Sequence, residues 1–275
     1  MPELPEIETI VKGLQNEIIK EVISHAVVLR EASIGHPSVK DFERLLPGRK
    51  VEHITRRGKY ILIHFVDKAC LVIHLKMSGR LLLKKKRSKH DKFLRILLEL
   101  ESGRELHFED MRVFGRMWYF KPNQKPEDHI KGLKTMGVEP LEDLSLGYLK
   151  PLLQKKTAPI KNVIMDQAII AGVGNIYADE SLFLAGIKPA RKAGSLKDKE
   201  IRALIDSIIK VLKASIKAGG SSMKDYTSLE GVNGNYMNQS FVYRRTGENC
   251  RQCKTQIERI KIGGRSTHFC SSCQK

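Results

Sequence analysis

The chain has 275 residues, 41% of them hydrophobic, so it is long enough for two domains and too apolar to stay disordered. Lys and Arg number 49 against 31 Asp and Glu, a formal net charge of +18, which favours a polyanionic partner, nucleic acid before membrane. No segment approaches the ~20 apolar residues of a membrane span, and the acidic N-terminus lacks a signal-peptide core, so we expect a cytoplasmic protein with no membrane partner.

The N-terminal segment Met1–Glu6 combines two prolines with two glutamates. Removal of Met1, which a small second residue favours, would leave Pro2 as a free secondary amine. Because α-amino groups titrate near pH ~8, part of this amine is nucleophilic at neutral pH and can form an iminium with a sugar aldehyde carbon. Glu3 and Glu6 would then donate or accept protons or stabilise charge. Taken alone, the segment is better explained as an ordinary helix start, with a proline in the first turn and glutamates favoured by the helix dipole.

Residues 3–20 carry apolar side chains at helical spacing, which predicts a helix packed on a larger body. From about 22 to 120 the pattern changes to short runs rich in β-forming residues and separated by turns. The predicted strands are Val22–Leu29, Lys50–Thr55, Tyr60–Val66, Leu71–Met77, Arg80–Leu83, Phe93–Leu100, Glu105–Phe108 and Arg116–Phe120. So many short strands in succession favour an antiparallel sandwich or barrel.

The polar, proline-containing stretch Lys121–Asp128 is the best candidate for an interdomain linker. Beyond it the period becomes helical, and helices are predicted at Ile160–Ile169, Ile176–Ala185 and Leu196–Ile216. A glycine-rich turn joins the first two, and Asn175 suits the N-cap of the second. Residues Ala218–Tyr236 are rich in Gly, Ser and Asn, which predicts a mobile loop.

The cysteines are placed unevenly along the chain. Cys70 lies in an apolar run and is interpreted as a small buried hydrophobe. The other four, Cys250, Cys253, Cys270 and Cys273, form two C-x2-C pairs separated by 16 residues, a spacing typical of a four-thiolate Zn²⁺ site. Two disulfides are the alternative, which a cytoplasmic location disfavours. One structural zinc ion is expected, because all four positions are filled and the segment has too few apolar residues for a core.

Several segments suit a polyanionic ligand. The turn Gly172–Asn175 presents backbone amides at a helix end, where a phosphate can bind. Lys59 begins a strand and is either ordinary solvated charge, or a phosphate contact or a group near a reacting sugar. The basic run Lys84–Lys92 is either solvated charge or a source of sequence-independent affinity. Arg265 would lie on a hairpin between the cysteine pairs, where it suits a phosphate.

Met77, Arg112 and Phe114 allow two interpretations. Met77 and Phe114 suit a core by their own context, and Arg112 suits a strand end. If all three project from adjacent loops, they form a wedge that fills the gap left by an everted nucleotide, whose unstacking costs about a few kcal/mol.

As a group, these residues resemble the formamidopyrimidine-DNA glycosylase family of bacterial base-excision repair enzymes, over essentially the whole chain. The resemblance is carried by Pro2–Glu6, Arg57–Tyr60, Met77–Gly79, Asp110–Gly115, Asp166–Glu180 and Gly264–Cys270. It implies an α+β fold with an N-terminal antiparallel β-sandwich domain flanked by helices (1–121) and a linker (122–135). A helical domain with a helix–two-turn–helix motif and lesion loop (136–235) and a four-cysteine zinc finger (236–275) would follow, with DNA in the cleft between the domains.

The resemblance also implies an activity, a bifunctional DNA glycosylase/AP lyase. It would excise 8-oxoguanine and formamidopyrimidines from damaged double-stranded DNA and cleave the strand by β,δ-elimination, as a monomer. In the catalytic set, Pro2 would attack C1′, Glu3 would protonate the ring oxygen, Glu6 would support the site, and Lys59 and Arg265 would contact phosphates. The residues implied to bind DNA are Met77, His90, Arg112, Phe114, Lys161, Asn175 and Tyr177. Arg112 would face the orphaned cytosine, and the loop within Gly219–Tyr236 would close over the damaged base.

The sequence departs from the family pattern at a few positions. Met111 and Val113 interrupt the usual Asp-Pro-Arg-Arg-Phe-Gly, Lys92 replaces the second histidine of Lys-His-Asp-His, and Arg244 stands where a glycine is usual. These departures bear on opposite-base preference and lesion range rather than on the catalytic residues.

Two other functions stay open on the sequence. One is an endonuclease VIII-like enzyme for oxidised pyrimidines, which Leu4 and the complete Met/Arg/Phe set argue against. The other is a catalytically silent DNA-binding zinc protein, which would need the basic surface and the finger but not Pro2, Glu3 or Glu6.

Overall fold

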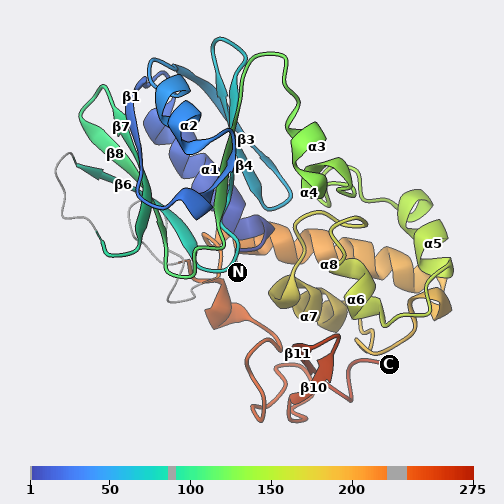
Figure 1. The fold of residues 1–275 in the computed structure, drawn as a ribbon. Coiled ribbons are helices and arrows are strands. Elements are labelled where there is room, and N and C mark those ends of the chain that lie inside the picture. The colour runs from blue at the N-terminus through green and yellow to red at the C-terminus, as the bar shows by residue number, and fades with distance from the viewer. Residues whose placement is uncertain (1, 86–90, 222–233) are drawn as a thin grey trace. The chain divides into compact units, whose positions relative to one another are not determined.

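The computed structural model describes residues 2–85, 91–221 and 234–275, and the chain divides into two compact units (Figure 1). Unit 1 comprises Met1–Lys134 and Gly219–Gly234, and unit 2 comprises Thr135–Ala218 and Asn235–Lys275. Unit 1 holds the two larger sheets, whereas unit 2 holds the longest helix and a small two-stranded sheet near the C-terminus.

Helix α1 (Leu4–Ile18) opens unit 1 and contributes one face to its core. The apolar residues at helical spacing are all buried, and one hydrophobic cluster joins them to residues of both sheets; they are Ile7, Ile10, Val11, Leu14 and Ile18. Burial of this face fixes the start of the helix, where Glu3 is the N-cap residue and Glu6 lies in the first turn.

Unit 1 contains a four-stranded and a five-stranded sheet. The first has the order β1 (Ile23–Val28), β7 (Leu94–Leu100), β8 (Arg104–Asp110) and β6 (Gly79–Lys85). The second has the order β2 (Ile34–His36), β9 (Arg116–Phe120), β5 (Cys70–His74), β4 (Tyr60–Phe65) and β3 (Val51–Arg57). All pairs are antiparallel except β2 with β9. Each of the eight predicted strands is present, with its ends shifted by a few residues.

Several short elements of unit 1 were not predicted. Strand β2, the 3₁₀ turn η1 (Glu31–Ser33) and helix α2 (Val39–Leu45) are too short to show a period in the sequence. The predicted linker Lys121–Asp128 is also not wholly irregular. Helix α3 (Pro126–His129) begins inside it, because a proline at the first helical position followed by two acidic residues favours a helix start. Helix α4 (Lys131–Lys134) follows at once.

Unit 2 is mainly helical. It contains α5 (Leu146–Gln154), α6 (Ile160–Ile164), α7 (Asn175–Leu184) and α8 (Asp198–Lys217), with the 3₁₀ turns η2 (Ala193–Ser195) and η3 (Tyr236–Gln239). Strands β10 (Glu258–Ile262) and β11 (Arg265–Phe269) form an antiparallel hairpin. The predicted fold class, α+β with an N-terminal β-sandwich and a helical region that ends in a four-cysteine finger, is confirmed.

Two helix boundaries in unit 2 correct the sequence predictions. Helix α6 ends at Ile164 rather than Ile169, and the chain turns at Asp166, whose carbonyl accepts bonds from two following amides. Gly174, not Asn175, is the N-cap of α7. Asn175 is the first helical residue, and its side chain is used elsewhere. The predicted mobile loop lies largely in residues 222–233, outside the described part of the chain.

Two further predictions concern the burial of Cys70 and membrane-spanning segments. Cys70 is buried as predicted, and burial raises the pKa of its thiol to about 12, so this sulfur is an inert part of the core. Among the helices of the described ranges, none has both the length and the apolar character that crossing a bilayer requires.

Candidate functional site

Two buried carboxylates lie at the N-terminus of the chain. Glu3 is 3% exposed and Glu6 is 5% exposed, and Pro2 beside them is also buried. The backbone N–H of Glu3 donates to Oε2 of Glu6 over 2.8 Å. Burial of both acids is unusual for an ordinary helix start, where first-turn glutamates normally face water. The segment is therefore built into unit 1 rather than being a solvated end.

Glu6 also binds a residue from the far end of unit 1. Its Oε1 accepts bonds from the backbone N–H of Ser221 over 2.8 Å and from the Ser221 hydroxyl over 2.9 Å. The preceding Gly220 has φ +87°, and a Cβ there would lie 3.1 Å from the same oxygen, so a side chain would be both strained and crowded. The start of the segment after α8 is thus anchored to the Glu6 carboxylate. The sequence analysis missed Ser221, which shows only as part of a Gly-Ser run.

Lys59 lies at the start of β4 and is buried, which excludes the interpretation as ordinary solvated charge. It lies close to His74 on β5, a residue that the sequence analysis did not single out. Burial, Lys76 and Lys59 together lower the pKa of His74 to about 3, so this imidazole is neutral at physiological pH. Its Nδ1 accepts the backbone N–H of Lys76 over 2.9 Å, and its ring contacts the ring of Tyr60 edge-on at 4.4 Å. The neutral ring adds no second charge beside Lys59.

Met77 and Phe114 are exposed rather than part of a core. Their side chains are 44% and 47% exposed, and the Arg112 guanidinium lies over the Phe114 ring with 4.6 Å between its Cζ and the ring centroid. The core interpretation of these residues is therefore wrong. The structure supports the alternative, a projecting apolar and cationic group, which we call the wedge.

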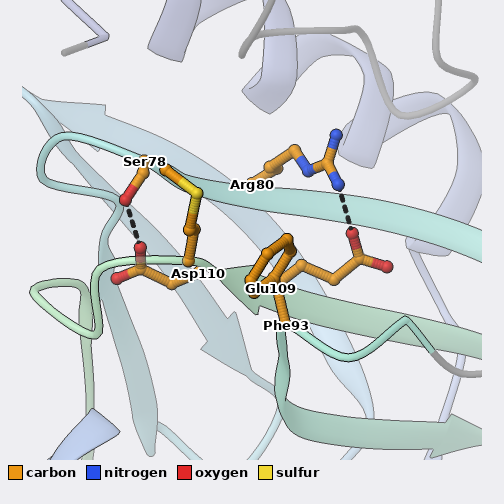
Figure 2. A pocket seen from close by; sticks show the side chains of 6 residues that line it. Ser78, Arg80, Phe93, Glu109 and Asp110 are labelled. Carbon is orange, nitrogen blue, oxygen red and sulfur yellow. Dashed lines mark hydrogen bonds and ion pairs between the residues drawn. The ribbon is translucent and has the colours of Figure 1, made fainter.

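Asp110 at the end of β8 joins the two turns that carry the wedge. Its Oδ1 accepts the Ser78 hydroxyl over 2.5 Å and the Arg112 backbone N–H over 3.1 Å, and its Oδ2 accepts the Gly115 N–H over 2.7 Å. Figure 2 shows the bond between Ser78 and Asp110. A Cβ at Gly115 would lie 2.5 Å from the Phe108 ring, so only glycine lets the second turn pack this closely. A buried carboxylate with these partners holds both turns in one arrangement.

In unit 2, Asn175 and Lys161 converge on the hairpin of β10 and β11. Nδ2 of Asn175 donates to the carbonyl of Ser266 over 3.1 Å, and Nζ of Lys161 donates to the same carbonyl over 3.0 Å. Nζ of Lys161 also donates to Oγ1 of Thr267 over 2.8 Å. Arg265, the residue before Ser266, is exposed. The helix end at Asn175 and the strand that carries Arg265 are therefore held together by shared bonds.

A fully buried ion pair lies behind this contact. Nζ of Lys161 is 2.7 Å from Oδ1 of Asp179 on α7, and Oδ2 of Asp179 accepts both the backbone N–H of His268 over 2.8 Å and a bond from its ring Nδ1 over 3.0 Å. The hydroxyl of Tyr177 is likewise internal, 2.6 Å from that of Ser215.

The side chains of Lys161 and Tyr177 are thus inside unit 2, although both were predicted to touch DNA. The correction has a physical reason. A buried ammonium is tolerated only when it is paired and fully hydrogen-bonded, and Lys161 meets that condition within the protein.

The four cysteines of the C-terminal segment converge as the spacing predicts. The sulfur atoms of Cys250, Cys253, Cys270 and Cys273 all lie within 4.8 Å of one another, and two of the separations are 3.9 Å and 3.4 Å. Tetrahedral Zn²⁺ with bonds of ~2.3 Å requires sulfur atoms about 3.8 Å apart. The donor set and its geometry fit one structural zinc ion, and the four sulfurs fill its coordination sphere.

Some predicted site residues fall outside the described part of the chain. These are His90, most of the basic run Lys84–Lys92, Met1, and most of the loop within Gly219–Tyr236.

Comparison with known proteins places these features in a family context. Family models match the chain in three segments: the formamidopyrimidine-DNA glycosylase N-terminal domain over residues 1–117, its H2TH domain over residues 136–227, and a zinc finger found in FPG and IleRS over residues 247–275. A formamidopyrimidine-DNA glycosylase of Prochlorococcus marinus subsp. pastoris is 43% identical, with 100% of each chain covered. One from Gloeobacter violaceus is 42% identical, with 100% of this chain and 98% of the relative covered.

Solved structures give the same result. Wild-type Lactococcus lactis Fpg (MutM) in complex with a DNA containing N7-benzyl-Fapy-dG superposes with a TM-score of 0.92 at 33% identity, covering 100% of both chains. MutM in complex with a DNA containing carbocyclic 8-oxo-G superposes with a TM-score of 0.92 at 34% identity, also covering 100% of both chains.

Proposed function

The chain belongs to the formamidopyrimidine-DNA glycosylase family, and from this premise we propose that it is a bifunctional glycosylase/AP lyase acting on oxidised purines in duplex DNA. The observation that carries the proposal is the buried cluster of Pro2, Glu3 and Glu6, which a DNA-binding protein without catalysis would not need. The solved relatives hold DNA with Fapy-dG and 8-oxo-G derivatives, which supports oxidised purines as the substrate class.

The chemistry centres on the amine of Pro2, once Met1 has been removed. Its nitrogen forms a bond to C1′ while the bond from C1′ to the damaged base breaks, and the base leaves with a proton. Glu3 donates a proton to the ring oxygen as the sugar opens, which leaves an iminium between Pro2 and C1′. Loss of a C2′ proton then expels the 3′ phosphate, and a second elimination expels the 5′ phosphate. The strand is cut on both sides of the sugar.

Glu6 has a supporting role in this scheme. Both of its oxygens are already engaged, one by the Glu3 backbone and one by Ser221. A carboxylate with these partners is held in place rather than free to carry protons. We assign Glu6 to positioning: it orients the backbone next to Pro2 and anchors the loop within Gly219–Tyr236, which we propose closes over the damaged base.

Lys59, Asn175 and Arg265 are proposed to bind the phosphates around the lesion. Arg265 is exposed and Asn175 lies at the N-terminus of α7, where backbone N–H groups also favour an anion. Lys161, Asp179 and Tyr177 support this group from the interior. His90 is proposed to add a further DNA contact.

The wedge is proposed to enter the base stack where the damaged nucleotide leaves it. Met77 and Phe114 expose apolar surface that only a partner would cover, and inserted apolar side chains compensate for unstacking. Arg112 would face the orphaned base. Because the curated relatives are bacterial, we place this activity in the cytoplasm, on nucleoid DNA, and expect a monomer to carry it out.

Borohydride trapping tests the proposal on a duplex with one 8-oxoguanine opposite cytosine. The wild type should form a covalent adduct, Pro2→Gly should form none, and Glu3→Gln should bind the duplex without excising the base. Glu8→Gln is the matched control, since Glu8 lies one turn along the same helix and pairs with Arg56. Normal binding without an adduct on any oxidised base would favour the silent binder, and faster excision of oxidised pyrimidines would favour the endonuclease VIII-like enzyme.

A further inference from the structure

A small pocket adjoins the wedge and has no role in the scheme above. It encloses about 190 Å³ and is lined by Ser78, Arg80, Phe93, Glu109, Asp110 and Met111 (Figure 2). Ser78 directly follows Met77 of the wedge, and Met111 directly precedes Arg112. Two residues of the pocket wall are therefore chain neighbours of wedge residues, and we call this cavity the Arg80 pocket.

Arg80 is held in a fixed orientation inside the pocket wall. Its Nη2 donates to Oε2 of Glu109 over 2.8 Å, as Figure 2 shows. Glu109 is buried, and its other oxygen accepts Nζ of Lys84 over 2.7 Å. Within the described ranges Glu109 is the one bonding partner of Arg80, so other N–H groups of the guanidinium are left for a ligand. The Arg80 side chain is 31% exposed, which makes these donors accessible.

The chemistry of the walls selects the kind of group that can enter. The oxygens of Glu109 and Asp110 already accept bonds, so the pocket offers donors from Arg80 and apolar surface from Phe93 and Met111. Arg80 and Lys84 together balance the charges of the two carboxylates, so the pocket offers no net positive charge to a phosphate, whereas a neutral acceptor needs none. A cavity of ~150 Å³ holds a benzene ring, so this one has room for a single ring.

We propose that the Arg80 pocket receives the carbonyl edge of the pyrimidine left opposite the excised purine, and that Arg80 is a specificity-determining residue for the opposite base. The inference rests on the proposed function, because it assumes that the wedge enters the stack at the lesion. Arg80 supplies a second donor beside Arg112, and Glu109 positions that donor. An adenine opposite the lesion has no carbonyl oxygen to accept a bond from Arg80, so it loses the contact.

The test is single-turnover excision of 8-oxoguanine opposite cytosine and opposite adenine. The ratio of the two rates should fall about tenfold in Arg80→Ala, the size expected for one arginine–base contact. Arg80→Lys should show the same fall, because a lysine keeps the charge but lacks the planar fork. Met111→Ala should widen the pocket and raise the rate opposite adenine.

Arg104→Ala is the matched control. Arg104 lies on β8 at the opposite end of its pairing with β6, is also 31% exposed, and bonds to Glu17 and Glu21. Arg104→Ala should leave the ratio of the excision rates opposite cytosine and opposite adenine unchanged. Thermal unfolding of each variant identifies any that fails to fold, and Arg80→Lys preserves the charge balance around Glu109 if Arg80→Ala does not fold.

Other outcomes overturn the inference. An unchanged ratio in both Arg80 variants would remove Arg80 from opposite-base recognition. A ratio that Arg80→Lys restores, together with a shallower salt dependence of binding in Arg80→Ala, would make the residue a phosphate contact. Failure of the proposed function is distinguishable, because then the wild type would excise 8-oxoguanine opposite neither base.

Discussion

Glu6 and Ser221, 215 positions apart in the chain, are joined by two hydrogen bonds to a single carboxylate oxygen. The bonds connect the helix that follows the proposed nucleophile Pro2 to the start of the loop proposed to cover the damaged base. The start of that loop and the backbone of Glu3 therefore share one carboxylate, that of Glu6. A defect in this contact should affect recognition of the base more than chemistry on the sugar.

Ser221→Ala removes the hydroxyl and leaves the backbone N–H in place. Since a hydrogen bond to a charged group contributes about 1.5–3 kcal/mol, we expect excision of 8-oxoguanine to slow by about tenfold or more. Cleavage of a duplex with a preformed abasic site should change little, because that substrate has no base for the loop to hold. Single-turnover assays on the two duplexes measure the difference. Equal losses on both substrates would argue against a role confined to the loop.

The buried pair of Lys161 and Asp179 supports the second unit. Lys161→Met should destabilise that unit by about 3–5 kcal/mol, because it leaves an unpaired buried carboxylate. The double variant with Asp179→Asn should recover much of the loss, since the uncompensated charge is gone. Urea unfolding followed by circular dichroism measures both. Trp118, the single tryptophan, lies in unit 1. The urea midpoint reported by its fluorescence should therefore be the same in both variants and the wild type. Equal instability of the single and double variants would contradict this interpretation of the pair.

Arg265 and Lys59 are expected to neutralise phosphates. Arg265→Ala and Lys59→Ala should each weaken binding to duplexes of any sequence and reduce the slope of log affinity against log salt by about one. Fluorescence anisotropy at several salt concentrations measures this slope. Arg44→Ala provides the comparison, because this exposed arginine is paired with Asp41 on α2. Slopes that match the wild type would show that the two side chains do not touch phosphate.

Removal of zinc should act on DNA binding through the finger hairpin. A chelator that strips the four-cysteine site should unfold residues 247–275, because metal binding supplies the folding free energy of such segments. The hairpin of β10 and β11 would then no longer position Arg265. Duplex affinity should fall by at least the amount seen in Arg265→Ala. Hydrogen exchange locates the unfolding, and added Zn²⁺ should restore affinity. Affinity that survives verified zinc loss would refute this role of the finger.

His74 makes the stability of unit 1 depend on pH. Its pKa is about 3 in the folded protein against an ordinary value of 6.5, so the unfolded chain binds the extra proton first as the pH falls. Stability should therefore be complete above pH 6.5 and decrease between pH 6.5 and 3, by up to about 1.4 kcal/mol per pH unit from this group.

His74→Phe keeps an aromatic contact with Tyr60 and removes the titrating group. Between pH 6.5 and 5 its unfolding free energy should fall by about 2 kcal/mol less than that of the wild type. Urea unfolding followed by Trp118 fluorescence at the two pH values measures the difference. An equal fall in both proteins would mean that other groups carry the pH dependence.

Local sequence determined much of this architecture. The strands of unit 1 were predictable because alternation and β-branched residues reflect the immediate neighbours of each residue. The zinc site was predictable because two C-x2-C pairs can place four sulfurs around one ion whatever surrounds them. Pro2, Glu3 and Glu6 could be proposed as catalytic residues from a short N-terminal motif, and their burial is a property of the fold. Elements of only a few residues, such as β2 and α2, were missed because they have no period to detect.

Tertiary contacts decided what each functional side chain does. Whether Met77 and Phe114 belong to a core or project from it depends on how two turns are joined by Asp110, which neither segment reveals alone. Lys161 looks like a surface cation until Asp179 and the finger hairpin enclose it. The burial of a side chain and its ion pairs depend on residues that are distant in sequence, so they are set only when the chain folds. The sequence alone therefore indicates the class of chemistry, and the fold determines which of its polar groups are exposed and which hold those groups in place.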